Sequence, residues 1–203
     1  DSNGNSLGYL PVPFRPNTEG YHLKRINFTY DPLTQQYYFT SWRDSPYDDE
    51  YSTIINNQIY QTSILICFNV TGQVLWTKTA NNASSAIVEG VLVDEQSNVY
   101  VSGRGTSSTV LPNGSNGPLN GNFGGYQFTN TLSRQSFVIK FNAQGNLLWG
   151  SNADGTAGDG LGGSGSESTR SMTINGEELA VGTGFYNNTW GAFGITGQPM
   201  GAF

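Results

Sequence analysis

Short apolar runs separated by polar turns make up most of the chain. β-Branched and aromatic residues fill these runs, and Asn-Gly, Gly-Asn and Asp-Gly pairs stand between many of them. Residues that favour helices are scarce. The pattern predicts an all-β protein whose short strands are joined by hairpin turns.

One hairpin sequence recurs along the chain, which indicates an internal repeat. FNVTGQVLW at residues 68–76 returns as FNAQGNLLW at residues 141–149, and a shorter copy, FGITGQPM, stands at residues 193–200. Each copy predicts a strand, a tight turn around its glycine, and a second strand. The third copy has Gly201 where the first two have tryptophan.

A second kind of strand pair precedes each copy, so every unit is expected to hold four strands. In the middle unit this pair covers residues 87–93 and 99–103, and the outer units turn at 31–34 and 175–176. The predicted fold is one all-β repeat domain of three four-stranded antiparallel blades, a β-propeller-like stack in an incomplete ring. The expected segments are an extended N-terminal piece at 1–20, units at about 21–80, 86–151 and 168–203, and long loop insertions at about 42–61 and 104–134.

The units resemble two known repeats. The SBBP repeat of secreted β-propeller proteins is similar to the second and third units, through Asp94 and residues 99–103, 136–149 and 162–165. Residues 71–76 also resemble the tryptophan-docking repeat of quinoprotein-type propellers. Both resemblances imply that Trp76 and Trp149 pack between blades. The quinone-binding residues of the second family have no match, since the chain lacks an adjacent cysteine pair.

Three blades do not close a ring, because propellers typically have four to eight. The first and third sheets are therefore expected to present one uncovered apolar face each, and such faces associate. Head-to-tail contact between the first blade of one copy and the third blade of the next would cover both faces. The expected partner is thus a second copy, in a closed homo-oligomer or an open polymer.

The charge balance excludes several partners. Nine Lys and Arg against 15 Asp and Glu give a formal net charge of −6 and a pI of about 4.6. Nucleic acid is not expected, because no basic patch is available for phosphates, and no apolar run is long enough for membrane insertion. Few charges and many Ser, Thr and Asn residues are typical of secreted, extracellular or cell-surface proteins. Sequons for N-glycosylation begin at Asn27, Asn69, Asn82, Asn113 and Asn187.

Groups suited to catalysis are few. His22 is the only histidine and Cys67 the only cysteine, so a catalytic triad or a zinc site has too few partners. Cys67 stands in an apolar strand, which predicts a buried thiol. No enzyme activity and no cofactor are expected, except that Asp154 and Asp159 are candidate Ca²⁺ ligands in a glycine-rich loop. The alternative for this loop is a connection that binds no ion.

Aromatic residues in the first insertion are candidate contacts for a ligand or partner. Trp42, Tyr47 and Tyr51 offer flat faces that can stack on sugar rings or dock a protein, and packing between blades is the alternative. Taken together, the sequence favours a non-catalytic extracellular structural protein, a subunit of a self-assembling filament or surface appendage. Two alternatives stay open: a glycan-binding or adhesion module, and a fragment of a longer secreted β-propeller.

Overall fold

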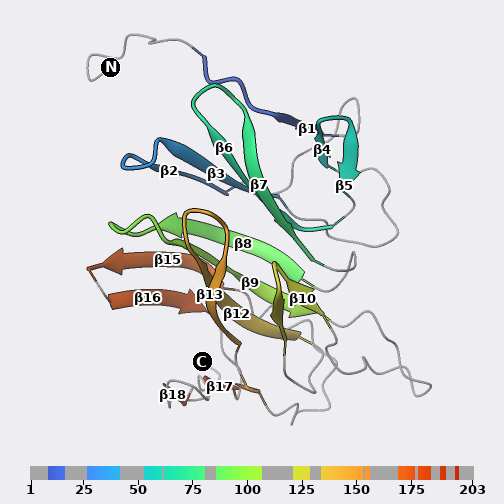
Figure 1. Ribbon diagram of the computed structural model, residues 1–203. Coiled ribbons are helices and arrows are strands. Elements are labelled where there is room, and N and C mark those ends of the chain that lie inside the picture. Colours follow the sequence, from blue (N-terminus) through green and yellow to red (C-terminus); the bar gives the residue numbers. More distant parts are fainter. Residues whose placement is uncertain are drawn as a thin grey trace, which may run out of the picture.

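The fold consists of β-strands and turns (Figure 1). The computed structural model describes residues 9–16, 27–41, 53–60, 62–80, 86–106, 121–128, 134–152, 154–155, 169–176, 178–183, 188–190 and 195–196. Within these ranges no helix occurs. The all-β class expected from the sequence is therefore confirmed.

Two four-stranded antiparallel sheets form the centre of the structure, and both are meanders. The first sheet has the order β2 (Asn27–Asp31), β3 (Gln36–Ser41), β6 (Ile64–Asn69) and β7 (Val74–Thr79). The second sheet has the order β8 (Ala86–Val93), β9 (Val99–Thr106), β12 (Arg134–Phe141) and β13 (Leu147–Asn152). The first two units thus form the four-stranded sheets that the repeat predicts.

Successive side chains of a strand point to opposite faces of the sheet, and in the first sheet both faces carry apolar residues. In β6, Leu65 and Cys67 face the second sheet, whereas Ile66 and Phe68 face the opposite side. A strand covered on both sides reads as a continuous apolar run. In β8 the pairing with β9 shifts register after Val88, which marks a β-bulge.

Both insertions leave the meander between its second and third strands, as predicted. In the first unit, β4 (Thr53–Ile55) and β5 (Gln58–Tyr60) form a small sheet with β1 (Phe14–Pro16) in the order β1-β4-β5. In the second unit, β10 (Asn122–Phe123) and β11 (Tyr126–Gln127) form a hairpin. This hairpin reaches the end of β7 through a bridge between Ala80 and Phe123, so it ties the two large sheets together.

The third unit departs from the prediction of a third four-stranded blade. Its first hairpin, β15 (Thr169–Asn175) and β16 (Glu178–Thr183), stands as a two-stranded sheet. Near the C-terminal end of the described residues, β17 (Asn188–Trp190) pairs with β18 (Ile195–Thr196) on one side and with β14 (Asp154–Gly155) on the other. The third copy of the hairpin sequence, around Gly197, lies outside the described residues except for Ile195 and Thr196.

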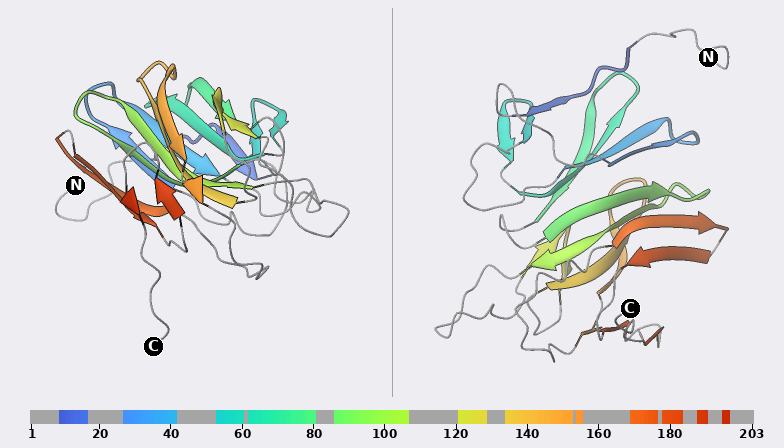
Figure 2. Two further views of the ribbon diagram at one scale, coloured as in Figure 1. Left: turned by 90° about the horizontal axis from the view of Figure 1, so that it is seen from below. Right: turned by 180° about the vertical axis from the view of Figure 1, so that it is seen from behind.

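The sheets are stacked in chain order, with the second sheet between the first sheet and the β15–β16 hairpin (Figures 1 and 2). A large cluster that includes Tyr38, Val101 and Phe137 fills the space between the two four-stranded sheets. On its other side the second sheet packs through Tyr100 and Val138 against the β15–β16 hairpin. The core is therefore divided into layers between sheets, as in other stacked-sheet folds.

The outer face of the first sheet is partly covered, contrary to the expectation of an open face. Phe14 of β1 stacks on Phe39 with ring centroids 3.9 Å apart, and Ile55 of β4 is buried in the same cluster. In Figure 2 the β1-β4-β5 sheet lies beyond the first sheet on the side away from β8. The N-terminal strand and the first insertion thus cover this face, which no local pattern predicts.

Candidate functional site

One turn is built in the same way in both four-stranded sheets. Residues 69–73 join β6 to β7 and residues 142–146 join β12 to β13; we call them the first and second docking turns. In each, the opening asparagine, Asn69 or Asn142, accepts hydrogen bonds through Oδ1 from the backbone N–H groups two and four residues later, at 2.8 to 3.1 Å. The glycine of each turn has a positive φ, +80° and +79°, which explains why the repeat keeps glycine there.

Trp76 packs from the first sheet onto the second docking turn. It lies opposite Cys67, on the face of β7 that meets the second sheet. Its Nε1–H donates a 2.9 Å hydrogen bond to the carbonyl oxygen of Ala143. A Cβ atom on Gly145 would lie 2.8 Å from the indole ring, so only glycine leaves room for this contact. The indole therefore fastens one sheet to the turn of the next.

Trp149 is the repeat equivalent of Trp76, but in the part of the chain that the structure describes no docking turn covers it. It lies on the face of β13 that points away from the first sheet, with its ring edge-on to Tyr100 at a centroid distance of 6.1 Å. The side chain is 37% exposed, and its neighbours Leu147 and Leu148 are 38% and 50% exposed. The turn of the third copy of the hairpin sequence, around Gly197, lies outside the described residues.

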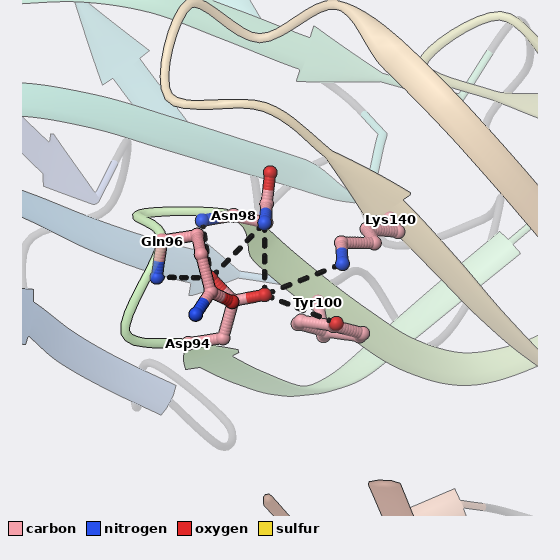
Figure 3. Close-up of polar contacts among 5 residues, drawn as sticks. All are labelled: Asp94, Gln96, Asn98, Tyr100 and Lys140. Atoms are coloured by element: carbon pink, nitrogen blue, oxygen red, sulfur yellow. Dashed lines mark hydrogen bonds and ion pairs between the residues drawn. The ribbon is translucent and has the colours of Figure 1, made fainter. Parts of the chain in front are cut away.

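A polar cluster surrounds Asp94 at the β8–β9 turn (Figure 3). Its five members are Asp94, Gln96, Asn98, Tyr100 and Lys140. The carboxylate of Asp94 accepts hydrogen bonds from the N–H groups of Gln96 and Asn98, at 3.0 and 2.8 Å, and from the side-chain amide of Asn98 at 2.9 Å. It also accepts a 3.1 Å bond from the Tyr100 hydroxyl and a 3.3 Å ion pair from Lys140. We call this group the Asp94 cluster.

Electrostatics in the Asp94 cluster favour the charged forms. Burial alone would raise the pKa of Asp94, but the hydrogen bonds from Asn98, Lys140 and Tyr100 outweigh it and lower the pKa below its usual value. Burial would likewise lower the pKa of Lys140, yet its bonds to Tyr100 and Asp94 raise it. Lys140 also lies over the Tyr100 ring, 4.7 Å from its centroid. The carboxylate and the ammonium group thus hold the turn onto the sheet.

The first sheet carries the equivalent aspartate, Asp31. It accepts hydrogen bonds from the N–H of Leu33 and the hydroxyl of Thr34. Burial opposes ionisation of Asp31, but bonds from Thr34 and from Ser97, in the β8–β9 turn, lower its pKa. The position of Lys140 is taken in this sheet by Cys67, whose pKa burial raises to about 12. This thiol is fully buried, as expected.

The residues singled out by sequence are distributed unevenly over the structure. Trp42, Tyr47, Tyr51, His22, Asp159, Asn82, Asn113 and Asn187 lie outside the described residues. Asp154 opens the short strand β14. Asn69 uses Oδ1 in the first docking turn. Asn27 donates its Nδ2, the atom that would carry a glycan, to the carbonyl of Glu89 in the second sheet.

The described side chains bring no three His, Cys, Asp or Glu residues together in a group able to hold a metal ion. The candidate Ca²⁺ ligands Asp154 and Asp159 stay a prediction from sequence. Among these residues there is also no helix long and apolar enough to cross a bilayer.

Sequence reasoning missed two features of the first sheet. An aromatic strip runs along its outer face, where Phe28 and Tyr30 are 48% and 41% exposed. Phe28 stacks on Tyr37 at a centroid distance of 5.4 Å, and Tyr30 lies tilted against Tyr37 at 4.6 Å. The N-terminal segment also reaches the first docking turn, where Pro11 lies against Gly72. Alternate aromatic residues in 28–30 were an available signal for the strip. Nothing local indicates the contact of Pro11.

Neither the protein-family models nor the curated proteins compared with this chain match it. The similarity to SBBP and tryptophan-docking repeats therefore stays an interpretation of the residues quoted above.

Proposed function

We propose that the protein is a non-catalytic structural module that assembles with copies of itself through exposed edges of its sheets. The observation that carries this proposal is the difference between two equivalent tryptophans. Trp76 is docked on the turn of the next sheet, whereas Trp149 and its two leucine neighbours form an exposed apolar edge. Exposed apolar patches on a sheet edge favour association.

The use of the charged groups supports a structural rather than a catalytic role. Asp94 and Lys140 bond to each other and to the turn that they stabilise, and Asp31 bonds to its own turn and to Ser97. A general acid or base needs a proton that it can exchange with a substrate. The pKa values of Asp31 and Asp94 are lowered and the pKa of Lys140 is raised, so all three groups stay charged at neutral pH.

The finer form of the fold belongs to the same proposal. We place the two four-stranded sheets and the third unit as blades of a propeller-like, incomplete ring, because the first strands β2, β8 and β15 pack beside one another. The low charge content and the acidic surface support an extracellular location, in a filament or surface appendage. No cofactor is proposed, apart from Ca²⁺ at Asp154 and Asp159.

Sedimentation velocity of the untagged protein tests the proposed function. The weight-average mass is expected to rise above 21.9 kDa with concentration, and Trp149→Ala should weaken the association at least about tenfold, as for a central aromatic contact. Leu75→Ala is the matched control, because Leu75 is a similarly exposed residue, at 42%, in the equivalent edge strand of the first sheet. A dispersed monomer at all concentrations would contradict self-assembly.

Glycan binding is the second candidate function, and the aromatic strip of Phe28, Tyr30 and Tyr37 favours it. Partly exposed aromatic rings, two of them carrying phenol hydroxyls, suit the apolar faces of sugars. Binding on a glycan array that is lost in Tyr30→Ala and kept in Tyr9→Ala would support this function. Tyr9 is the control because it is 99% exposed outside the strip.

A further inference from the structure

The two docking turns are alike, but different groups cover them. Trp76 covers the second turn, where a Cβ on Gly145 would approach the indole ring to 2.8 Å. Pro11 covers the first turn, where a Cβ on Gly72 would lie 2.6 Å from the Pro11 carbonyl oxygen and 3.1 Å from its Cγ. The N-terminal segment therefore occupies the position in which a tryptophan of a preceding sheet would dock.

The segment that carries Pro11 is held by a small number of contacts. Leu10 and Phe14 pack on the outer face of the first sheet, and the three residues of β1 pair with β4. Tyr9 and Val12, in contrast, are 99% and 52% exposed. A short edge strand with exposed neighbours opens at a lower free energy than the sheets beneath it.

The other half of the docking contact lies in the second sheet, on its edge strand β13. Trp149 follows Leu148 as Trp76 follows Leu75, and both tryptophans lie opposite the third strand of their sheet with a bulge beside them. Trp149 faces away from the first sheet, while Gly72 belongs to the first sheet. One copy of the chain thus carries both complementary parts of the Trp76 contact on different surfaces.

We propose that residues 10–14 are a removable plug on the first docking turn, and that Trp149 of a second copy takes the place of Pro11 over Gly72. Its Nε1–H would donate to the Val70 carbonyl, the repeat equivalent of the Ala143 carbonyl. A second copy is the occupant because the internal interface is made by the same turn and the same tryptophan. The contact is heterologous, so repetition gives a head-to-tail chain.

This inference rests on the proposed self-assembly and adds to it the acceptor surface and its regulation. A closed plug lowers the apparent affinity by the fraction of chains that are open. The double variant L10S/P11G is therefore expected to self-associate about tenfold more tightly than the wild type if one wild-type chain in ten is open. If the double variant does not unfold cooperatively, P11G alone replaces it, because P11G keeps Leu10 packed on the outer face of the first sheet.

Two half-blocked variants test the contact itself by sedimentation velocity. The acceptor variant L10S/P11G/W149A exposes the turn but has no tryptophan to donate. The donor variant G72A keeps Trp149 but carries a Cβ on the turn. Each is expected to stay monomeric alone, and an equimolar mixture should form a particle of twice the 21.9 kDa monomer mass and no larger one. Circular dichroism confirms that each variant is folded.

The control for G72A is G125A, because Gly125 also has a positive φ, +95°, but a Cβ there meets nothing within 4 Å. G125A should associate like the wild type. Self-association of the donor variant alone, or a monomeric mixture while the wild type associates, would overturn the plug and its acceptor turn. If no form of the protein associates, the proposed function fails, and the result is distinguishable from failure of the plug.

Discussion

Replacement of Trp76 by alanine is expected to lower the free energy of unfolding by about 3 kcal/mol, as other large-to-small changes of packed aromatic residues do. The variant loses the indole that packs between the first sheet and the second docking turn, and with it the hydrogen bond to the Ala143 carbonyl. Because Gly145 has no side chain, the turn cannot fill the space. Urea unfolding followed by circular dichroism in dilute solution measures the change.

Trp149→Ala is the matched control for Trp76→Ala, since the two residues share sequence context and strand position. It should lower the free energy of unfolding by only about 1 kcal/mol, because replacing a partly exposed residue removes less buried surface. Trp76→Phe should fall between the two, as it keeps a ring but loses the Nε1–H donor. Equal losses for the two alanine variants would contradict the assignment of Trp76 as the docked residue.

The second large effect is expected at Asp94. Asp94→Ala removes the acceptor for the turn N–H groups, the Tyr100 hydroxyl and the Lys140 ammonium group. Breaking a buried charge pair while its partner stays in place costs about 3 kcal/mol or more. Glu95→Ala, at the exposed next position of the same turn, should change stability by less than about 0.5 kcal/mol. Urea unfolding of the two variants at neutral pH gives the comparison.

The lowered pKa of Asp94 adds a pH dependence with a definite sign. A carboxyl group whose folded pKa lies below its unfolded value stabilises the protein above the unfolded pKa, and this stabilisation is lost as the pH falls through the folded pKa. Wild-type stability should therefore fall between about pH 5 and pH 2. Asp94→Asn should show a smaller fall, with a remainder from Asp31. An unchanged slope in Asp94→Asn would contradict the role of Asp94.

Local sequence determined the strands and turns of this protein. The opening asparagine and the glycine of each docking turn satisfy the backbone and allow the positive φ within five residues. The recurrence of the hairpin and of the strand pair before it indicated four-stranded sheets with insertions in the middle. These features were predictable because the interactions that produce them join residues close together in the chain.

For the two tryptophans and the Asp94 cluster, the sequence indicated the residues but not their contacts. The two tryptophans share their sequence context, so a local pattern treats them as equal. The Asp94 cluster had a signal in the aspartate that opens both first turns, but its ion pair needs Lys140 of β12, more than forty residues away. A contact of that kind depends on strand register, which the order of the sheet decides.

Only the tertiary structure decided which surfaces of the repeat are filled. The repeat predicts a third four-stranded blade, whereas in the described residues β17 pairs with β14 and Trp149 is 37% exposed. Charge and composition give no hint that Pro11 covers Gly72. The physical reason is that hairpins form from neighbours, while the choice among distant edges and faces depends on the total surface buried when the whole chain is folded. Sequence by itself thus determined the repeated turns and tryptophans of this protein, and tertiary packing decided that Trp76 is docked, that Trp149 is partly exposed and that Pro11 covers the first docking turn.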